Sequence, residues 1–163
     1  MARWTGTWLS GLGAAGIELR PVDGWRGRRL GLPPEGPGAV ATTGARIAAF
    51  MVDALASGLV AALIIPDPVD PRRGLLGIAV LAIENILLLS LTGRTFGMQL
   101  LGLRVRPVRA DDARIGFLPA CVRTALLTLL VPALIFDRDG RGLHDKAAGT
   151  VVVKAKGAKS FAA

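Results

Sequence analysis

The stretch GARIAAFMVDALASGLVAALII, residues 44–65, is apolar over most of its length but contains two charged side chains, Arg46 and Asp53. A helix of this length crosses the hydrocarbon core of a bilayer, which is about 30 Å thick. We therefore predict a transmembrane helix over residues 45–65. Arg46, near its start, can extend its side chain to lipid phosphates. Asp53 lies about a dozen ångströms into the helix. A lone carboxylate there costs at least ~2.5–3.5 kcal/mol, so it must face other protein groups or water.

Two more apolar segments follow, over residues 74–92 and 119–136. Between them, residues 93–118 alternate apolar and basic side chains around the turn-forming sequence RADDAR, which predicts a short cytoplasmic hairpin or an interfacial segment. The sequence AGTVVVKA, residues 148–155, is typical of a strand. The expected fold class is an all-α membrane protein, a small bundle of about three transmembrane or re-entrant helices with that short hairpin or interfacial segment.

The composition supports a membrane protein. Hydrophobic residues make up 52% of the 163 residues, which is typical of small polytopic membrane proteins and rare in soluble domains of this size. The net charge of +8 comes from basic residues that flank the apolar segments, so the expected partner is a bilayer with anionic headgroups rather than a nucleic acid. We expect a flexible basic N-terminal tail over residues 1–43, a membrane domain over residues 44–153 and a basic C-terminal tail over residues 154–163.

The distribution of Lys and Arg predicts the orientation. The N-terminal tail and the loop after the second apolar segment each carry five arginines, whereas the first connection has only Arg72 and Arg73 beside two aspartates. The N-terminus is therefore expected in the cytoplasm. Three full spans would place the basic C-terminal tail outside, against the same charge rule. The alternative, which we favour, is a re-entrant third segment, because that segment is short and has Pro132 near its end.

Four polar residues of the apolar segments fall in the same half of the bilayer: Asp53, Glu84, Asn85 and Arg123. We predict that they form one intramembrane cluster, with Arg46 above it near the headgroups. Two carboxylates and one arginine would leave this cluster net negative, which favours binding of a proton or a cation. Alternatively, Asp53 and Arg123 form an ion pair that only fixes the register of the helices.

The first helix also carries small residues at four-residue spacing, namely Ala54, Gly58 and Ala62. Such spacing lets helices approach closely. The partner could be the second helix or another copy of the chain. With one cysteine, Cys121, and one histidine, the chain offers no disulfide and no zinc set. No nucleophile–base pair is recognisable, so we expect no enzyme activity, no metal and no cofactor.

Four motifs occur in order: RIAAFMVD at the first helix, GRTFGMQLLGLRV after the second, the arginine that opens the third, and GLHDKAAGTVVV. Together they resemble the RDD family of integral membrane proteins over residues 40–153. The preceding RRLGLPPEGPGAVA is similar to the short actinobacterial members of that family. The arginine and two aspartates that name the family match Arg46, Asp53 and Asp145. The second motif carries a set of glycines and arginines: Gly93, Arg94, Gly97, Gly102 and Arg104.

The resemblance implies a multi-pass protein of the bacterial plasma membrane. A few members of the family are reported to be sodium/proton antiporters, so we expect an ion-coupled transporter or a transporter subunit that uses the intramembrane cluster. The alternative is a non-catalytic accessory or assembly subunit of a larger membrane complex. No internal repeat is visible, and alternating access then needs packed copies, so we expect a homo-oligomer or a larger complex.

Asp145 lies outside the apolar segments, in the last of the four motifs. It could bind an arginine of the loop, Arg94 or Arg104, and lock the C-terminal tail under the bundle. Alternatively, it caps a short turn that Gly149 ends.

Overall fold

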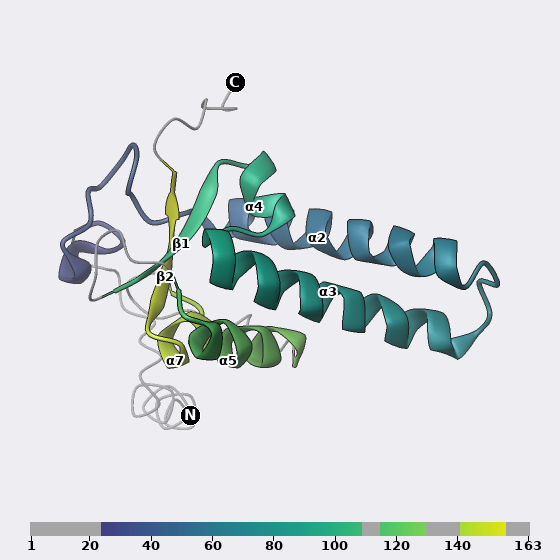
Figure 1. The fold of residues 1–163 in the computed structure, drawn as a ribbon. Helices are drawn as coiled ribbons and strands as arrows, with labels where there is room; N and C mark the ends of the chain where they lie inside the picture. The colour runs from purple at the N-terminus through teal and green to yellow at the C-terminus, as the bar shows by residue number, and fades with distance from the viewer. Residues whose placement is uncertain (1–23, 109–114, 130–140, 156–163) are drawn as a thin grey trace, which may run out of the picture.

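The computed structural model describes residues 24–108, 115–129 and 141–155. Two long helices, α2 (Thr43–Ile64) and α3 (Pro71–Thr92), run antiparallel and project from a smaller body that contains a two-stranded sheet (Figure 1). The predicted first and second helices are thus confirmed. Each begins and ends within three residues of the expected bounds.

Local sequence signals set the ends of the two helices. The Thr42 side chain caps α2 by accepting a hydrogen bond from Ala45 N, and the Asp70 side chain caps α3, with Pro71 at its first position. Gly93 ends α3 in the left-handed conformation, with φ 73°, which glycine adopts without steric cost. The hairpin of α2 and α3 is therefore encoded by its own capping residues.

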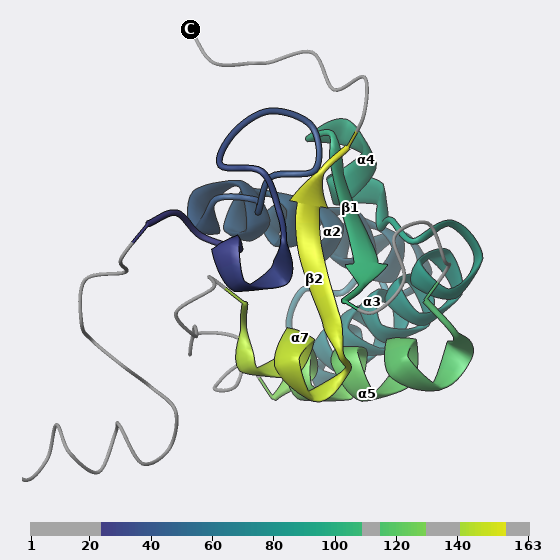
Figure 2. The same cartoon turned by 90° about the vertical axis from the view of Figure 1, so that its left-hand side faces the viewer.

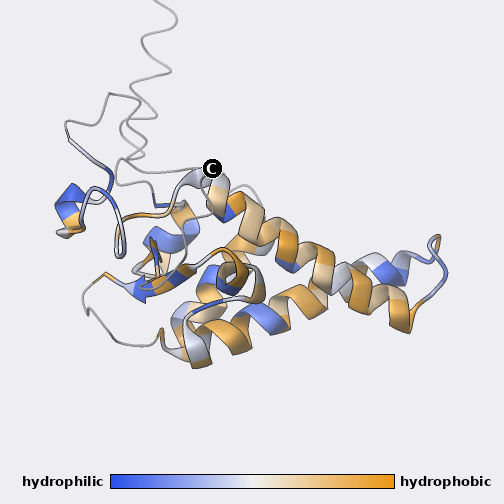
Figure 3. Cartoon of the chain, turned by 90° about the horizontal axis from the view of Figure 1, so that it is seen from above, coloured by the Kyte–Doolittle hydropathy of each residue, from blue (hydrophilic) through white to orange (hydrophobic). Residues whose placement is uncertain are grey.

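Both long helices are long and apolar enough to cross a membrane. Only 22% of the apolar window of α2 and 11% of that of α3 is buried, whereas a core helix of a soluble protein is mostly buried. Figure 3 shows apolar residues along both helices and polar ones at the body and at the far turn. These two candidate transmembrane helices indicate a membrane location. Exposed large apolar side chains on them include Met51, Leu55, Leu59, Leu63, Leu75, Ile83, Leu87 and Leu91.

The buried face of α2 has four-residue spacing and consists of Ala49, Asp53, Ser57 and Ala61. It packs against α3 of the same chain. At Gly77 of α3, an added Cβ would lie 3.7 Å from Ala61 Cβ and 3.9 Å from Gly58 Cα. Small residues therefore do allow close approach here.

The predicted stripe of Ala54, Gly58 and Ala62 lies beside this face rather than at its centre, because all three residues are only partly buried. The buried face is therefore shifted by one residue from the predicted stripe, because Ser57 and Ala61 occupy its centre in place of Gly58 and Ala62. Of the two partners left open, the structure places the second helix at this stripe.

The remaining elements form the body. In chain order they are α4 (Phe96–Leu100), β1 (Leu103–Pro107), α5 (Phe117–Thr128), α7 (Leu143–Ala147) and β2 (Thr150–Lys154). The two strands pair antiparallel, with Leu103 opposite Lys154 and Pro107 opposite Thr150. The fold is therefore mostly helical, not all-α as expected. The strand predicted over residues 148–155 is confirmed.

Of the two alternatives predicted for residues 93–118, a hairpin or an interfacial segment, the hairpin forms with a different partner strand. β1 does form from LRVRP, but residues 115 and 116 are not in a strand and Phe117 already begins α5. β1 pairs instead with β2, whose residues Thr150 to Val153 are all buried. A strand that is buried on both faces needs apolar side chains along its whole length. The run of valines in β2 provides them.

The segment that precedes α2 runs along the edge of β2 that faces away from β1 (Figure 2), where Ala41 N donates to Val152 O and Lys154 N donates to Ala39 O. Leu32 and Val40 pack against Val151 and Val153, and Val40 forms an isolated bridge with Val153. A short 3-10 helix, η1 (Arg28–Leu30), lies in this segment. Residues 24–42 are thus part of the packed body, although the sequence suggested that they belong to the tail. Residues 1–23 lie outside the described part of the chain.

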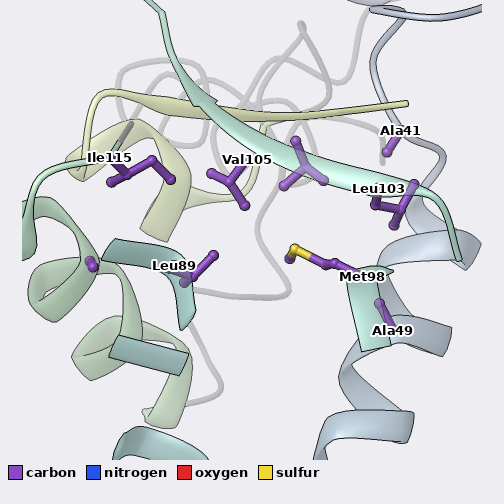
Figure 4. Close-up of a cluster of buried hydrophobic side chains, with 9 residues drawn as sticks. Ala41, Ala49, Leu89, Met98, Leu103, Val105 and Ile115 are labelled. Atoms are coloured by element: carbon purple, nitrogen blue, oxygen red, sulfur yellow. The ribbon is translucent and has the colours of Figure 1, made fainter. Parts of the chain in front are cut away.

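The inner face of the sheet covers the main apolar core. Val105 and Leu103 point from β1 toward Leu89 of α3 and Met98 of α4 (Figure 4). Ile115 completes this cluster on the side of α5. The core therefore joins the sheet to the ends of the two long helices where the helices meet the body.

The strand pairing decides how the third apolar segment runs. β1 precedes α5 and β2 follows α7, and the two strands are hydrogen-bonded neighbours. The chain therefore leaves and returns to the same end of the molecule between residues 107 and 150. α5 has 12 residues and spans about 18 Å, too short for a full crossing. This geometry favours the re-entrant alternative over three full spans. The rest of the predicted third helix, residues 130–136, lies outside the described part.

Candidate functional site

Two buried arginines share one aspartate at the junction of the helices and the sheet. Arg46 Nη1 of α2 lies 3.1 Å from Asp145 Oδ2, and Arg123 Nη1 of α5 lies 2.6 Å from Asp145 Oδ1. The side chain of Asp145 is fully buried, and those of the arginines are 9% and 4% exposed. One carboxylate thus joins α2, α5 and α7.

Further polar contacts hold this aspartate to the sheet. Arg46 Nη2 donates to the carbonyl oxygen of Val152 in β2, at 3.2 Å. The Thr150 hydroxyl donates to Asp145 O at 3.3 Å, and the His144 Nε2 atom lies 3.5 Å from Asp145 Oδ1. Side chains from three helices and the backbone of one strand therefore meet at Asp145.

The burial of these charged side chains is consistent with a structural role, in which they link the helices. Two guanidinium groups and one carboxylate are paired out of water, and removing one partner of a buried pair leaves the other charge uncompensated. Arg46 and Asp145 are 99 residues apart in the sequence, so the contact joins the start of the domain to its end. We call Arg46, Arg123 and Asp145 the arginine–aspartate clamp.

A second group of polar side chains surrounds the first turn of α4. Asp53 of α2 is 2% exposed. Its Oδ2 accepts a hydrogen bond from the Thr95 hydroxyl at 2.6 Å, and its Oδ1 accepts one from Gly97 N at 2.5 Å. The Thr95 side chain in turn accepts from Met98 N and so caps α4. Asp53 therefore holds the start of α4 against α2.

Glu84 of α3 reaches the same turn from the other helix. Its carboxylate accepts a hydrogen bond from the Ser57 hydroxyl at 3.3 Å and lies near the backbone of Phe96, the first residue of α4. Asp53 and Glu84 are close enough to repel each other electrostatically. The two carboxylates, one from each long helix, thus lie together at the start of α4, where Asp53 binds Gly97 N. We call Asp53 and Glu84 the acidic pair.

The close approach of α4 to α2 depends on Gly97. A Cβ atom at this position would collide with the carbonyl oxygen of Ala49. Ala49 itself is fully buried. Glycine therefore lets the α4 backbone come near enough to α2 for Gly97 N to reach the Asp53 carboxylate.

The structure separates the four residues that were expected to form one cluster. Arg123 pairs with Asp145 and not with Asp53, although it is close enough to attract the Asp53 carboxylate. Asn85 donates to Leu81 O of its own helix. Asp53 and Glu84 do meet, but around the α4 backbone rather than around an arginine.

Two expectations about the family motif residues are corrected. Arg46 was expected to reach lipid phosphates, but it binds Asp145 and Val152 because the strand and α7 pack over the start of α2. Asp145 was expected to bind a loop arginine or to cap a turn. It binds two arginines of the helices, and its side chain does not cap α7.

The glycines of the loop motif serve the backbone. Gly93 caps α3, and its carbonyl oxygen accepts from Val105 N. Gly102 has φ 63°, and its carbonyl oxygen accepts from Ala155 N beyond β2. Arg94 and Arg104 are partly exposed, and the Arg94 backbone N–H donates to the Thr92 hydroxyl. The motif therefore shapes the passage from α3 through α4 to β1.

Sequence reasoning missed Thr95 and Ser57, which hold the acidic pair. Thr95 precedes a short apolar helix, the usual place of an N-cap, and Ser57 lies one turn after Asp53 on the same face. Both signals were present. The contact of Arg46 with the Val152 carbonyl oxygen could not be predicted, because every residue has a backbone carbonyl and the residue type does not show which one is used.

Within the described ranges, no three side chains of His, Cys, Asp or Glu come together as a metal site requires. The model of the RDD family matches residues 40–149, which is more than half of the chain. No curated protein and no solved structure matches the chain. The matched range contains both the arginine–aspartate clamp and the acidic pair, and the chain belongs to the RDD family.

Proposed function

We propose that this RDD-family chain is a multi-pass protein of the bacterial plasma membrane that acts as a small ion-coupled transporter or as the ion-binding subunit of one. Its acidic pair, Asp53 and Glu84, is the proposed site for a proton or a monovalent cation. The body with its sheet lies on the cytoplasmic side, together with the N-terminus. The proposal includes no catalytic step and no cofactor.

The observation that carries this proposal is the placement of the two carboxylates. Each long helix contributes one, and both lie at the start of α4, where Asp53 accepts a hydrogen bond from Gly97 N and Glu84 lies near Phe96. Arg123, the arginine expected to neutralise them, is engaged by Asp145. Two neighbouring carboxylates in an apolar setting are stabilised by one added positive charge, which a proton or a cation can provide.

The contacts of the acidic pair suggest how binding would couple to motion. Protonation or cation binding would weaken the hold of Asp53 on Gly97 N, because an ionised carboxylate is the stronger acceptor. α4 is a five-residue helix held at its start by Asp53, which binds Thr95 and Gly97 N. Its release would open the space between α2 and α3 on the cytoplasmic side. The small scaffold favours a homo-oligomer, since one copy has only two helices of spanning length among its described residues.

A flux assay tests this function. Purified protein in liposomes that contain a pH-sensitive dye should change the internal pH when a sodium or potassium gradient is applied. Glu84→Gln and Asp53→Asn should abolish this change, while Glu35→Gln, at an exposed position of the segment before α2, should not. Glu84 is only partly buried, so its variant keeps the test informative if Asp53→Asn fails to fold. Undiminished flux in a folded Glu84→Gln variant would contradict the proposal.

A second candidate function is that of an accessory subunit in a larger membrane complex. The rows of exposed apolar side chains on α2 and α3, with the small chain, favour it. Mild detergent extraction from native membranes should then yield a stoichiometric protein partner. Recovery of homo-oligomers alone, together with cation-dependent flux, would decide for the transporter.

A further inference from the structure

A cavity of about 220 Å³ lies between α2, α3 and α5. Neither member of the acidic pair lines it, and its lining includes no charged side chain. Apolar side chains from all three helices form most of its wall, among them Phe50 of α2, Leu81 of α3 and Leu127 of α5. The cavity is therefore separate from the proposed ion site.

Two buried polar side chains face this apolar space. Thr124 is 3% exposed, and its hydroxyl has no hydrogen-bond partner within the described part of the chain. The backbone oxygen of Thr124 is satisfied, because it accepts from the Thr128 hydroxyl at 2.9 Å. A buried hydroxyl without a partner costs about 1–3 kcal/mol. The Thr124 hydroxyl therefore has unmet hydrogen-bonding capacity at the wall of this cavity.

Asn85 provides the second polar group. It is 2% exposed, and its Nδ2 donates to Leu81 O at 2.9 Å. No hydrogen bond to its Oδ1 is formed by the residues that the structure describes. The cavity therefore offers one free acceptor, Asn85 Oδ1, and one free hydroxyl, Thr124 Oγ1, on two different helices.

We propose that this cavity binds a small neutral molecule with an apolar ring and one hydroxyl group. The ligand hydroxyl would donate to Asn85 Oδ1 and accept from the Thr124 hydroxyl. A dry apolar cavity of about 150 Å³ holds one benzene molecule, so this larger one has room for a ring with a short alkyl group. A charged ligand does not fit, because the lining has no countercharge to replace its lost hydration.

Alkylphenols and cyclic alcohols are the chemical class that meets these demands. They partition into the bilayer, and the wall of the cavity is made by the two candidate membrane helices and α5. Because α3 lies between α2 and α5 (Figure 1), a ligand there would bridge α5 to the helical hairpin. This inference goes beyond the proposed transport and does not depend on it.

Binding can be measured on the full chain in lipid nanodiscs with 4-tert-butylphenol and, as the matched hydrocarbon, tert-butylbenzene. The phenol should bind saturably, in excess of empty nanodiscs, and roughly three- to tenfold more tightly than the hydrocarbon, as expected for one net hydrogen bond. Thr124→Val keeps the shape of the side chain and should remove most of this preference. Thr92→Val removes a hydroxyl at the end of α3, outside the cavity lining, and should leave the preference unchanged.

A cavity-filling variant and a photoreactive probe locate the site. Leu127→Trp should abolish saturable binding, and a diazirine-bearing phenol should label residues of α3 and α5 in the wild-type chain. Unsaturable uptake equal to that of empty nanodiscs would overturn the proposal. Equal affinity of the wild-type chain for the phenol and the hydrocarbon would contradict the proposal that Asn85 and Thr124 recognise the ligand hydroxyl. Unchanged phenol binding by folded Leu127→Trp would place the ligand elsewhere and so contradict the proposal.

Discussion

Arg46 and Arg123 approach the same carboxylate, that of Asp145, from opposite oxygens, at 3.1 Å and 2.6 Å. Each arginine lies on a different helix, and the aspartate lies on a third. The contact therefore fixes the position of α5 and α7 relative to the start of α2. Its strength can be tested because all three side chains are almost completely buried.

Asp145→Asn should destabilise the fold strongly. The variant leaves two buried guanidinium groups close together with no carboxylate between them, which we expect to cost about 3–5 kcal/mol of unfolding free energy. Thermal unfolding in detergent, followed by circular dichroism, measures the loss. Glu35→Gln is the charge-matched control at an exposed site and should unfold like the wild type. Equal unfolding temperatures for Asp145→Asn and the control would show that the clamp contributes nothing.

Arg46 and Asp145 should be energetically coupled. If they act as a pair, the double variant Arg46→Met with Asp145→Leu should lose less stability than the sum of the two single variants. Asp145→Leu alone leaves both arginines without a carboxylate, whereas the double variant leaves only Arg123 in that state. The same unfolding measurements on four proteins give the coupling. Additive losses would mean that each residue acts through separate contacts.

Gly97→Ala should disturb the contact between α4 and α2. The added methyl group meets the Ala49 carbonyl oxygen, so we expect a loss on the order of 1–3 kcal/mol, as for overpacked positions. Gly44→Ala, in the first turn of α2, meets nothing within 4 Å and should be neutral or slightly stabilising. A Gly97→Ala variant as stable as Gly44→Ala would show that α4 can move away from α2 without cost.

Thr95→Val should weaken the hold of Asp53 on α4. The variant loses the 2.6 Å hydrogen bond to Asp53 Oδ2 and the cap of α4, for an expected cost of about 1–3 kcal/mol. Thr95→Ser keeps the hydroxyl and should recover most of the loss. If valine and serine behave alike, the cost comes from packing and not from the hydrogen bond.

The strand pairing predicts which residues share one side of the membrane. In a Cys121→Ser background, cysteines at Glu35 and Lys154 should react with an impermeant maleimide only after the cells are opened. A cysteine at Val69, in the turn between α2 and α3, should react in intact cells. All three positions are exposed. Labelling of the Lys154 position in intact cells would contradict the prediction that β1 pairs with β2 on the cytoplasmic side of the membrane.

The sequence predicted the features that depend on neighbouring residues. The apolar lengths of residues 44–65 and 74–92 predicted α2 and α3, although the Asp70 cap and Pro71 begin α3 three residues earlier than expected. The valine run of β2 was also recognisable. What failed were contacts across large sequence separations. The polar pattern of β1 did not reveal that its paired residues in β2 lie 43 to 51 positions later, beyond α5.

The candidate sites show the same division. Membrane depth correctly brought Asp53 and Glu84 together, because both count from helix ends that the sequence marks. The same depth argument also placed Arg123 beside Asp53 and Glu84, because it does not consider other carboxylates that can bind this arginine. Asp145, outside the apolar segments, binds this arginine at 2.6 Å. Only the fold of α7 and β2 over the helices brings that aspartate within reach.

The 99-residue separation between Arg46 and Asp145 also bears on biosynthesis. At ribosomal rates of 5–20 residues per second, Asp145 emerges roughly 5 to 20 s after Arg46. During that interval α2 and α3 are completed, while Arg46 has neither its aspartate nor the Val152 carbonyl oxygen. The nascent chain must keep this guanidinium hydrated or at the headgroups until its last residues arrive. A chain cut short before Asp145 would keep that charge unmatched, a state that membrane quality control can distinguish from the finished protein.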